Sequence, residues 1–108
     1  MSFGMDDRRK GFESKWAHDA ELRFQVEARR NRALGEWAAV KKGLTGDAVE
    51  AFVGSVIAAD FQEAGDEDVF RKLRRDFDVA KVTVSDHQIR RTMDEMMQQA
   101  IVQIRSET

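Results

Sequence analysis

The feature of this chain that most constrains its fold is a long proline-free stretch from Phe12 to Leu44. Its apolar residues stand at positions 22, 26, 33, 37, 40 and 44, at steps of four, seven, four, three and four residues. Side chains at these intervals share one face of a helix. The spacing predicts one long helix, whose C-terminal half is apolar enough to need cover from other helices.

The composition agrees with an all-α fold. The 108 residues contain no proline and no tyrosine, while 42% are hydrophobic and 35% are charged. These values are typical of a helical domain rather than of a disordered chain or a β-sandwich. A chain of this length buries roughly 60–70% of its unfolded surface and can fold as one domain. The absence of cysteine excludes disulfides and thiol catalysis, and it is consistent with an intracellular compartment.

Two further helices are predicted from apolar faces of their own. The first covers about 46–63 and is expected to be the most buried element, with a face made of Ala48, Val49, Phe52, Val53, Val56, Ile57 and Phe61. The second covers about 67–80, and its buried face contains Val69, Phe70, Leu73, Phe77 and Ala80. Between the long helix and its successor, Gly43 and Gly46 are expected in left-handed conformation. Thr45 is expected to cap the second helix.

The last helix, about 86–105, has the clearest start signal. Ser85 as N-cap and Gln88 three residues later form a capping box, with Val84 and Ile89 placed as a hydrophobic staple. A methionine-rich stripe follows, which we interpret as core filling rather than as an adaptable binding surface. With the long helix at about 18–44, the short connections favour a four-helix bundle over residues 18–108.

Residues 1–17 are predicted to form a separate N-terminal segment that is flexible in the free protein. Glycines at positions 4 and 11 oppose a helix, since glycine costs about 1 kcal/mol relative to alanine. In a helical form, Met5, Phe12 and Trp16 would share one face. The segment is therefore either a disordered tail or a peptide that folds in a partner's groove, and the two aromatic residues favour docking.

Charge and targeting signals exclude several classes of partner. The 18 Lys and Arg residues against 20 Asp and Glu give a net charge of −2, so no basic excess indicates a nucleic-acid binder. The N-terminus lacks the apolar region of a signal peptide and the Met-Gly start of myristoylation. Because no apolar run approaches 18 residues, we expect no membrane insertion.

The chain lacks the groups of an enzyme. It has two histidines, no cysteine and no complete nucleophile, zinc or Walker motif, so we expect neither catalysis nor a metal site. His18 stands beside Asp19 and near Glu21, yet we interpret both His18 and His87 as surface residues.

Three basic clusters could instead meet phosphates: Arg29, Arg30 and Arg32; Arg71, Lys72, Arg74 and Arg75; Arg90 and Arg91. The alternative is that they are solvated faces paired with acids three or four residues away. A nucleotide fits them better than a polymer, because no aromatic platform for bases accompanies them. The predicted site is the positive start of the last helix, with Ser85, His87, Arg90 and Arg91, or with Arg29 and Arg30 within reach.

Several short stretches, in order and spacing, resemble one family. They are Phe12-Glu13, Lys15 to Asp19, Ala28 to Asn31, Leu34 to Ala39, Gly65 to Lys72 and Ser85 to Arg90. This pattern is similar to the zeta-subunit family of alphaproteobacterial F1Fo ATP synthases, over about Phe3 to Ile104. The resemblance implies a four-helix bundle that inhibits ATP hydrolysis by F1, its N-terminal segment inserted at a catalytic α/β interface near the γ subunit.

The resemblance also implies particular contacts and a ligand. The partner-binding residues would be Phe3, Arg8, Arg9, Phe12, Glu13, Lys15 and Trp16, and ADP or ATP would act as a regulatory ligand. The protein would be a monomer when free, cytoplasmic, and peripheral to the inner membrane through F1. The family pattern has an alanine where Gly11 stands and an acid where Arg9 stands. A nucleotide-sensing bundle with weak or no inhibition is the alternative function.

Overall fold

The computed structural model describes residues 19–60 and 66–107, and this part of the chain is all-helical. Four helices follow one another: α2 (Ala20–Lys41), α3 (Asp47–Ala59), α4 (Glu67–Val79) and α5 (Asp86–Glu107). They contain 83% of the described residues, which include no strand. The predicted all-α bundle is confirmed. The predicted N-terminal segment and its flexibility lie outside the described residues.

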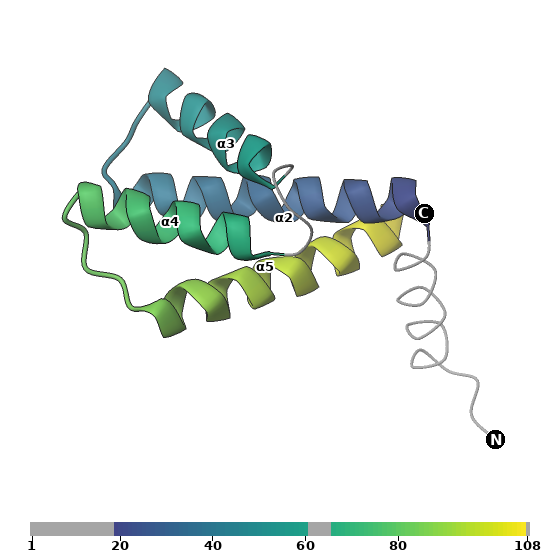
Figure 1. The fold of residues 1–108 in the computed structure, drawn as a ribbon. Helices are drawn as coiled ribbons and strands as arrows, with labels where there is room; N and C mark the ends of the chain where they lie inside the picture. Colours follow the sequence, from purple (N-terminus) through teal and green to yellow (C-terminus); the bar gives the residue numbers. More distant parts are fainter. Residues whose placement is uncertain (1–18, 61–65, 108) are drawn as a thin grey trace.

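The longest two helices form the body of the bundle (Figure 1). α2 packs against α3 and α5, and α4 packs against α3 and α5. α2 and α5 run in opposite directions, so that the C-terminal end of α5 lies beside the start of α2. Within the described part of the chain, none of the helices is both long and apolar enough to span a membrane.

The core has two clusters of buried side chains. The larger one joins all four helices around Leu34, Leu73, Phe77 and Ile89, and Trp37 meets Phe77 edge to face at a centroid distance of 5.6 Å. The smaller one joins α2 and α5 through Val26, Ala100, Ile101 and Ile104. Met93 is buried, while Met96 and Met97 pack against the two clusters. The interpretation of the methionine stripe as core is confirmed.

The buried face of α2 differs from the predicted one. Its buried residues include the small Gly35, Ala38 and Ala39, whereas Val40 is 77% exposed. α2 rather than α3 contributes the most buried residues, and the predicted core positions Ala48 and Ala80 are exposed. The prediction counted only large apolar side chains. The buried face of α2 also contains small residues, which let the backbones of neighbouring helices pack closely.

α2 and α3 approach each other closely at Gly35. A Cβ atom at Gly35 would stand 2.9 Å from both the Cα and the Cγ2 of Val53. Real side chains do not tolerate such a distance, so only glycine fits this crossing. The contact sets α3 directly on α2.

Helix ends follow local chemistry, with two corrections. α2 begins after Asp19, whose carboxylate accepts from Glu21 N and Leu22 N, and it ends at Lys41 rather than at Leu44. Gly43 has φ 75°, and Leu44 N donates to Ala39 O at 2.9 Å, which closes a Schellman motif and stops the helix.

The second correction concerns the next helix start. The N-cap of α3 is Gly46, with φ 61°, rather than Thr45, and it makes no side-chain capping bond. The predicted cap of α5 is confirmed, because Gln88 N donates to Ser85 Oγ at 3.0 Å. Val84 and Ile89, predicted as the hydrophobic staple, are both buried in the larger core cluster.

Candidate functional site

A buried polar network centred on Arg30 joins three helices. Arg30 Nε donates to Asn31 Oδ1 at 2.9 Å, Arg30 Nη1 donates to Asp66 Oδ1 at 2.6 Å, and Arg30 Nη2 lies 3.4 Å from Asp60 Oδ1. Asn31 Nδ2 in turn donates to Asp60 Oδ2 at 2.9 Å. The Arg30 side chain is 1% exposed. Arg30 is therefore neither part of a solvated face nor accessible to a phosphate in this arrangement. Its ion pairs connect the end of α3 and the start of α4 to α2.

Glu27 lies one turn before this network. Partial burial raises the pKa of its carboxyl group, and the charge of Asp60 raises it further, against the lowering effects of Arg30 and Arg23. The carboxylates of Glu27 and Asp60 also line a small hollow of about 50 Å³ with Phe24 and Asn31. Two acidic side chains, Glu27 and Asp60, thus lie close together at this corner of the bundle.

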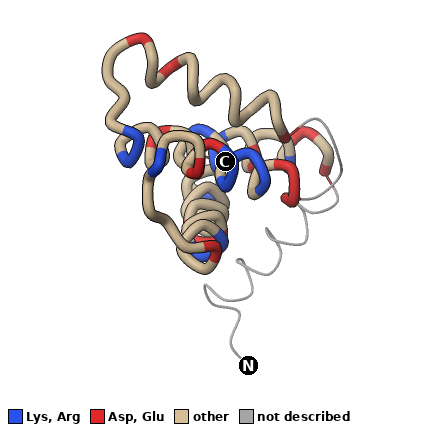
Figure 2. Tube along the Cα trace, turned by 60° about the vertical axis from the view of Figure 1, so that its left-hand side comes forward, with Lys and Arg blue, Asp and Glu red and all other residues tan. Residues whose placement is uncertain are grey.

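The neighbouring arginines of α2 point elsewhere and are paired. Arg29 donates to both carboxylate oxygens of Glu107, at 2.5 and 3.1 Å, and this hydrogen bonding lowers the pKa of Glu107. Arg32 lies 3.4 Å from the Glu50 carboxylate. α3 itself carries acids and no bases, as Figure 2 shows.

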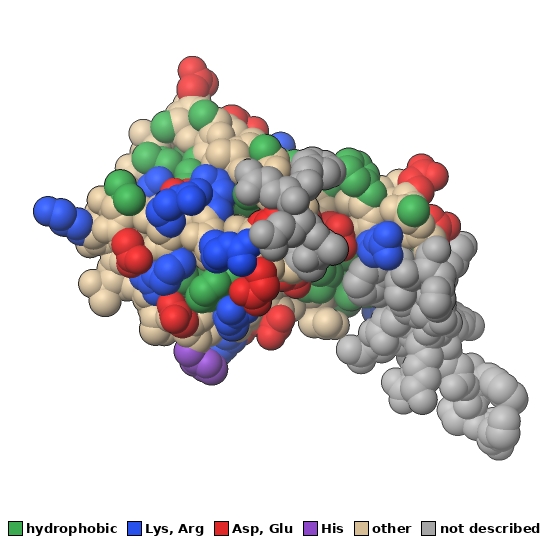
Figure 3. All heavy atoms as spheres, in the orientation of Figure 1, with side chains coloured by type: hydrophobic (Ala, Val, Ile, Leu, Met, Phe, Trp, Pro, Cys, Tyr) green, Lys and Arg blue, Asp and Glu red, His purple; other side chains and the backbone are tan. Residues whose placement is uncertain are grey.

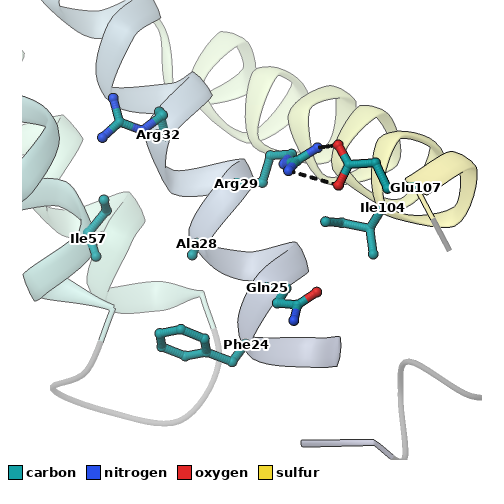
Figure 4. Close-up of a pocket in the computed structure, with 8 residues that line it drawn as sticks. All are labelled: Phe24, Gln25, Ala28, Arg29, Arg32, Ile57, Ile104 and Glu107. Atoms are coloured by element: carbon teal, nitrogen blue, oxygen red, sulfur yellow. Dashed lines mark hydrogen bonds and ion pairs between the residues drawn. The ribbon is translucent and has the colours of Figure 1, made fainter. Parts of the chain in front are cut away.

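An open groove of about 500 Å³ runs between α2, α3 and α5 (Figure 4). Phe24 is 54% exposed at its edge, which is unusual for an aromatic ring at the start of a bundle helix. The other residues that line the groove are Gln25, Ala28, Arg29, Arg32, Ile57, Ile104 and Glu107. The groove therefore combines apolar side chains with three charged ones, Arg29, Arg32 and Glu107.

The start of α5 gathers four of the residues predicted to meet phosphate. Arg90 donates to Glu67 at 3.1 and 3.2 Å and stacks on Phe70 at 3.9 Å from the ring centroid. Arg91 donates to Glu95 at 2.9 Å. Ser85 and His87 are exposed, and the Ser85 hydroxyl already accepts the Gln88 N–H.

The structure does not bring Arg29 to that site. Arg29 pairs with Glu107, which is 20 residues after His87 along one helix, or roughly 30 Å at 1.5 Å per residue. Over α4 and α5, basic and acidic side chains alternate rather than forming a continuous basic surface (Figure 3). The predicted pairing with acids three or four residues away is confirmed for Arg91 with Glu95, whereas Arg90 pairs with Glu67 of α4, 23 positions earlier.

A separate hollow of about 240 Å³, with basic side chains in its lining, lies between α3 and α4. It is lined by Ser55, Ala58, Ala59, Asp68, Arg71, Lys72 and Arg75. Lys72 already pairs with Asp76 at 2.7 Å, and Arg71 donates to Asp68 at 2.9 Å. Among residues 19–60 and 66–107, no cluster of three or more metal-ligating side chains could hold an ion.

All seven residues predicted to bind a partner (Phe3, Arg8, Arg9, Phe12, Glu13, Lys15 and Trp16) lie outside the described residues. Sequence reasoning missed the groove beside Phe24 and the burial of Arg30. Phe24 carried a signal, because it falls outside the apolar spacing of α2 and is still aromatic. Arg30 carried none, because its acidic partners are 30 and 36 positions away.

Comparison with known proteins gives one family and one fold. The model of the family described as ATPase inhibitor subunit zeta matches residues 1–103. A protein solved by solution NMR is similar over 81% of this chain and 99% of its own, with 37% identity and a TM-score of 0.70. A search of curated protein sequences finds no match.

Proposed function

Since the chain belongs to the ATPase inhibitor subunit zeta family, we propose that it inhibits ATP hydrolysis by inserting its N-terminal segment into the F1 sector of ATP synthase. The segment enters a catalytic α/β interface next to the γ subunit, where Phe12 and Trp16 act as apolar anchors. The charged residues Arg8, Arg9, Glu13 and Lys15, together with Phe3, set its register. The protein is a regulator rather than an enzyme, and it reaches the membrane surface only through F1.

The observation that carries this proposal is the extent of the family match. It covers residues 1–103 and so includes both the N-terminal segment and all but the end of the bundle. Catalytic interfaces of such machines must close for chemistry to proceed. A short peptide that occupies one interface is therefore sufficient to stop hydrolysis.

The bundle supports the segment mechanically. The Asp19 carboxylate caps α2 immediately after the segment, so a stable helix starts at Ala20. The Arg30 network then ties α2 to the end of α3 and the start of α4. A rigid bundle attached directly after the N-terminal segment limits how deeply the segment can insert into F1 and how it can be oriented there.

The test is the rate of ATP hydrolysis by purified F1 with increasing amounts of the protein. We expect inhibition by the parent, and weakening by roughly 2 kcal/mol, about thirtyfold in affinity, in the Phe12→Ala/Trp16→Ala variant. Val40→Ser serves as a matched control, because Val40 is exposed on α2 outside the groove. Equal inhibition by the double variant and the parent would contradict the assignment of these two anchors.

A second candidate function is nucleotide sensing at the start of α5. It is favoured by one observation: Ser85, His87, Arg90 and Arg91 all lie at the cap or in the first two turns of α5. Unpaired backbone N–H groups and the helix dipole favour phosphate there. Regulation by bound ADP or ATP is compatible with inhibition, since the two functions use different parts of the chain.

A further inference from the structure

We propose that the groove between α2, α3 and α5 binds residues 1–18 of the same chain, with Phe12 and Trp16 packed against Phe24 and Ala28. The structure of the groove and the position of Asp19 carry this inference. Its functional consequence rests on the proposed inhibitory role of the same segment.

The connection places the segment beside the groove. It joins the described structure at Asp19, and Phe24 is only five residues further, or roughly 7 Å along α2. Eighteen extended residues reach at most about 60 Å, far more than the length of the groove. A short covalent connection gives an effective concentration in the millimolar range, which favours this occupant over a free partner.

The register of a returning helix suits the groove. If the segment turns back at Asp19 and runs antiparallel to α2, Phe12 falls level with Val26, because both are seven residues from the turn. That level lies between Phe24 and Ala28, which both line the groove. Phe12 thus meets the apolar part of the groove, and Trp16, three residues from the turn, falls level with Leu22, two positions before Phe24.

The shape of the groove leaves room for aromatic rings. Ala28 is the small residue of its floor, and Figure 4 shows Ile57 of α3 and Ile104 of α5 on either side of α2. A ring lying over Ala28 would contact both walls and the edge of Phe24. Aromatic pairs in such offset or edge contacts are favourable beyond their buried area.

The groove itself is lined by Arg29, Arg32 and Glu107, and acidic side chains stand along its rim on one side. On the α3 side, Glu27 and Asp60 line the small hollow that continues the groove. Burial raises the pKa of the Glu27 carboxyl, and the charge of Asp60 raises it further. Residues 8–10 of the segment are three consecutive bases. They would lie along this acidic rim once Phe12 occupies the groove.

Docking would regulate inhibition, because Phe12 and Trp16 cannot fill the groove and the F1 interface at once. The free protein would be divided between a docked form and a form competent to bind F1. Apparent affinity for F1 falls in proportion to the competent fraction. A change that empties the groove should therefore make the protein a stronger inhibitor.

The first experiment is NMR on the full chain with labelled isoleucine methyl groups. We expect NOEs from the Trp16 indole and Phe12 ring to the methyls of Ile57 and Ile104. The Phe12→Ala/Trp16→Ala variant should shift these two signals and leave those of Ile89, which is buried in the larger core cluster, unchanged. Absence of the NOEs overturns the docking, and NOEs that arise only between differently labelled molecules assign the groove to a second copy and overturn it too.

The second experiment measures inhibition of F1 by Phe24→Ser. We expect half-inhibition at a roughly three- to tenfold lower concentration than for the parent, because the competent fraction rises. Val40→Ser should match the parent, since it changes another exposed apolar residue of α2 that lies outside the groove. Unchanged potency of Phe24→Ser overturns the regulatory role. If no form of the chain inhibits F1, the proposed function fails while the NOEs still decide the docking.

Discussion

Arg30 on α2 donates to the Asp66 carboxylate at 2.6 Å, across 36 residues of sequence. The arginine side chain is 1% exposed and the aspartate side chain 52% exposed, so a buried cation is held by an acid at the surface. Asp60 lies on the other side of the guanidinium at 3.4 Å. The two acids flank the connection from α3 to α4, so one arginine fastens both ends of that connection to α2.

Replacing Arg30 by alanine should destabilise the bundle by roughly 3 kcal/mol. The change removes a buried charged group that pairs with two acids, so Asp60, Asp66 and Asn31 all lose their contact with the guanidinium. Urea unfolding followed by circular dichroism measures the effect. Arg91→Ala is the matched control, because Arg91 pairs with Glu95 on the exposed surface of α5 and should cost less than about 1 kcal/mol. Equal losses for the two variants would contradict a structural role for Arg30.

The two adjacent arginines of α2 show how far sequence reasoning reaches. Apolar spacing, capping residues and glycines predicted an all-α chain, the Ser85 cap and the left-handed Gly43, because these depend on interactions within a few residues. Arg29 and Arg30 are adjacent residues of the same type, so interactions within a few residues do not distinguish them. One pairs with Glu107 at the surface and the other is buried between Asp60 and Asp66.

The candidate groove was beyond prediction for a related reason. Its lining comes from three helices, and these are brought together by the packing of α3 on α2 and by the return of α5 to the start of α2. Both are packing relations between distant segments, and helical periodicity contains no information about them. The segment expected to bind F1 lies outside the described residues, so its contacts remain a prediction.

Gly35→Ala should destabilise the protein by roughly 1–3 kcal/mol. The added Cβ would meet the backbone of Val53 at 2.9 Å, and this overpacking outweighs the gain of about 1 kcal/mol in helix propensity. Gly54→Ala is its control, because nothing lies within 4 Å of a Cβ at Gly54 in the middle of α3. The control should stabilise the protein by up to about 1 kcal/mol. The measurement is thermal and urea unfolding of both variants, and stabilisation by Gly35→Ala would contradict the close approach.

Glu27→Gln should stabilise the protein at pH 7, and the gain should disappear in acid. The raised pKa of Glu27 means that the folded state prefers the protonated carboxyl. The contribution of this carboxyl to the stability of the folded protein is therefore present at low pH and is lost as the pH rises through the folded-state pKa. Below the ordinary glutamate pKa of about 4.3, the parent is protonated in both states and the variants should converge. Unfolding curves at pH 7 and pH 4 test this. Glu36→Gln, on the exposed face of the same helix, controls for the general loss of a negative charge.

Titration with ADP should move the amide signals of Ser85, His87 and Arg91 before any others. These residues are exposed at the cap and in the first turns of α5, whereas the guanidinium of Arg30 is buried in its own network. Arg91→Ala should weaken binding by roughly 1.5–3 kcal/mol through loss of a charge-assisted hydrogen bond. Arg75→Ala on α4 is the control. Shift changes confined to residues far from Ser85 to Arg91 would remove this site.

Gly11→Ala should strengthen inhibition of F1 by up to about 1 kcal/mol, or roughly fivefold in affinity. Position 11 lies between Arg8 and Trp16, in the segment that we propose to insert into F1 as a helix, and alanine lowers the cost of forming such a helix. The measurement is the concentration that halves ATP hydrolysis by F1, with Gly54→Ala as a glycine-to-alanine control in the bundle. Bundle stability should not change, because position 11 precedes the Asp19 cap of α2. A weaker inhibitor would show that the bound segment is bent at Gly11 rather than helical through it.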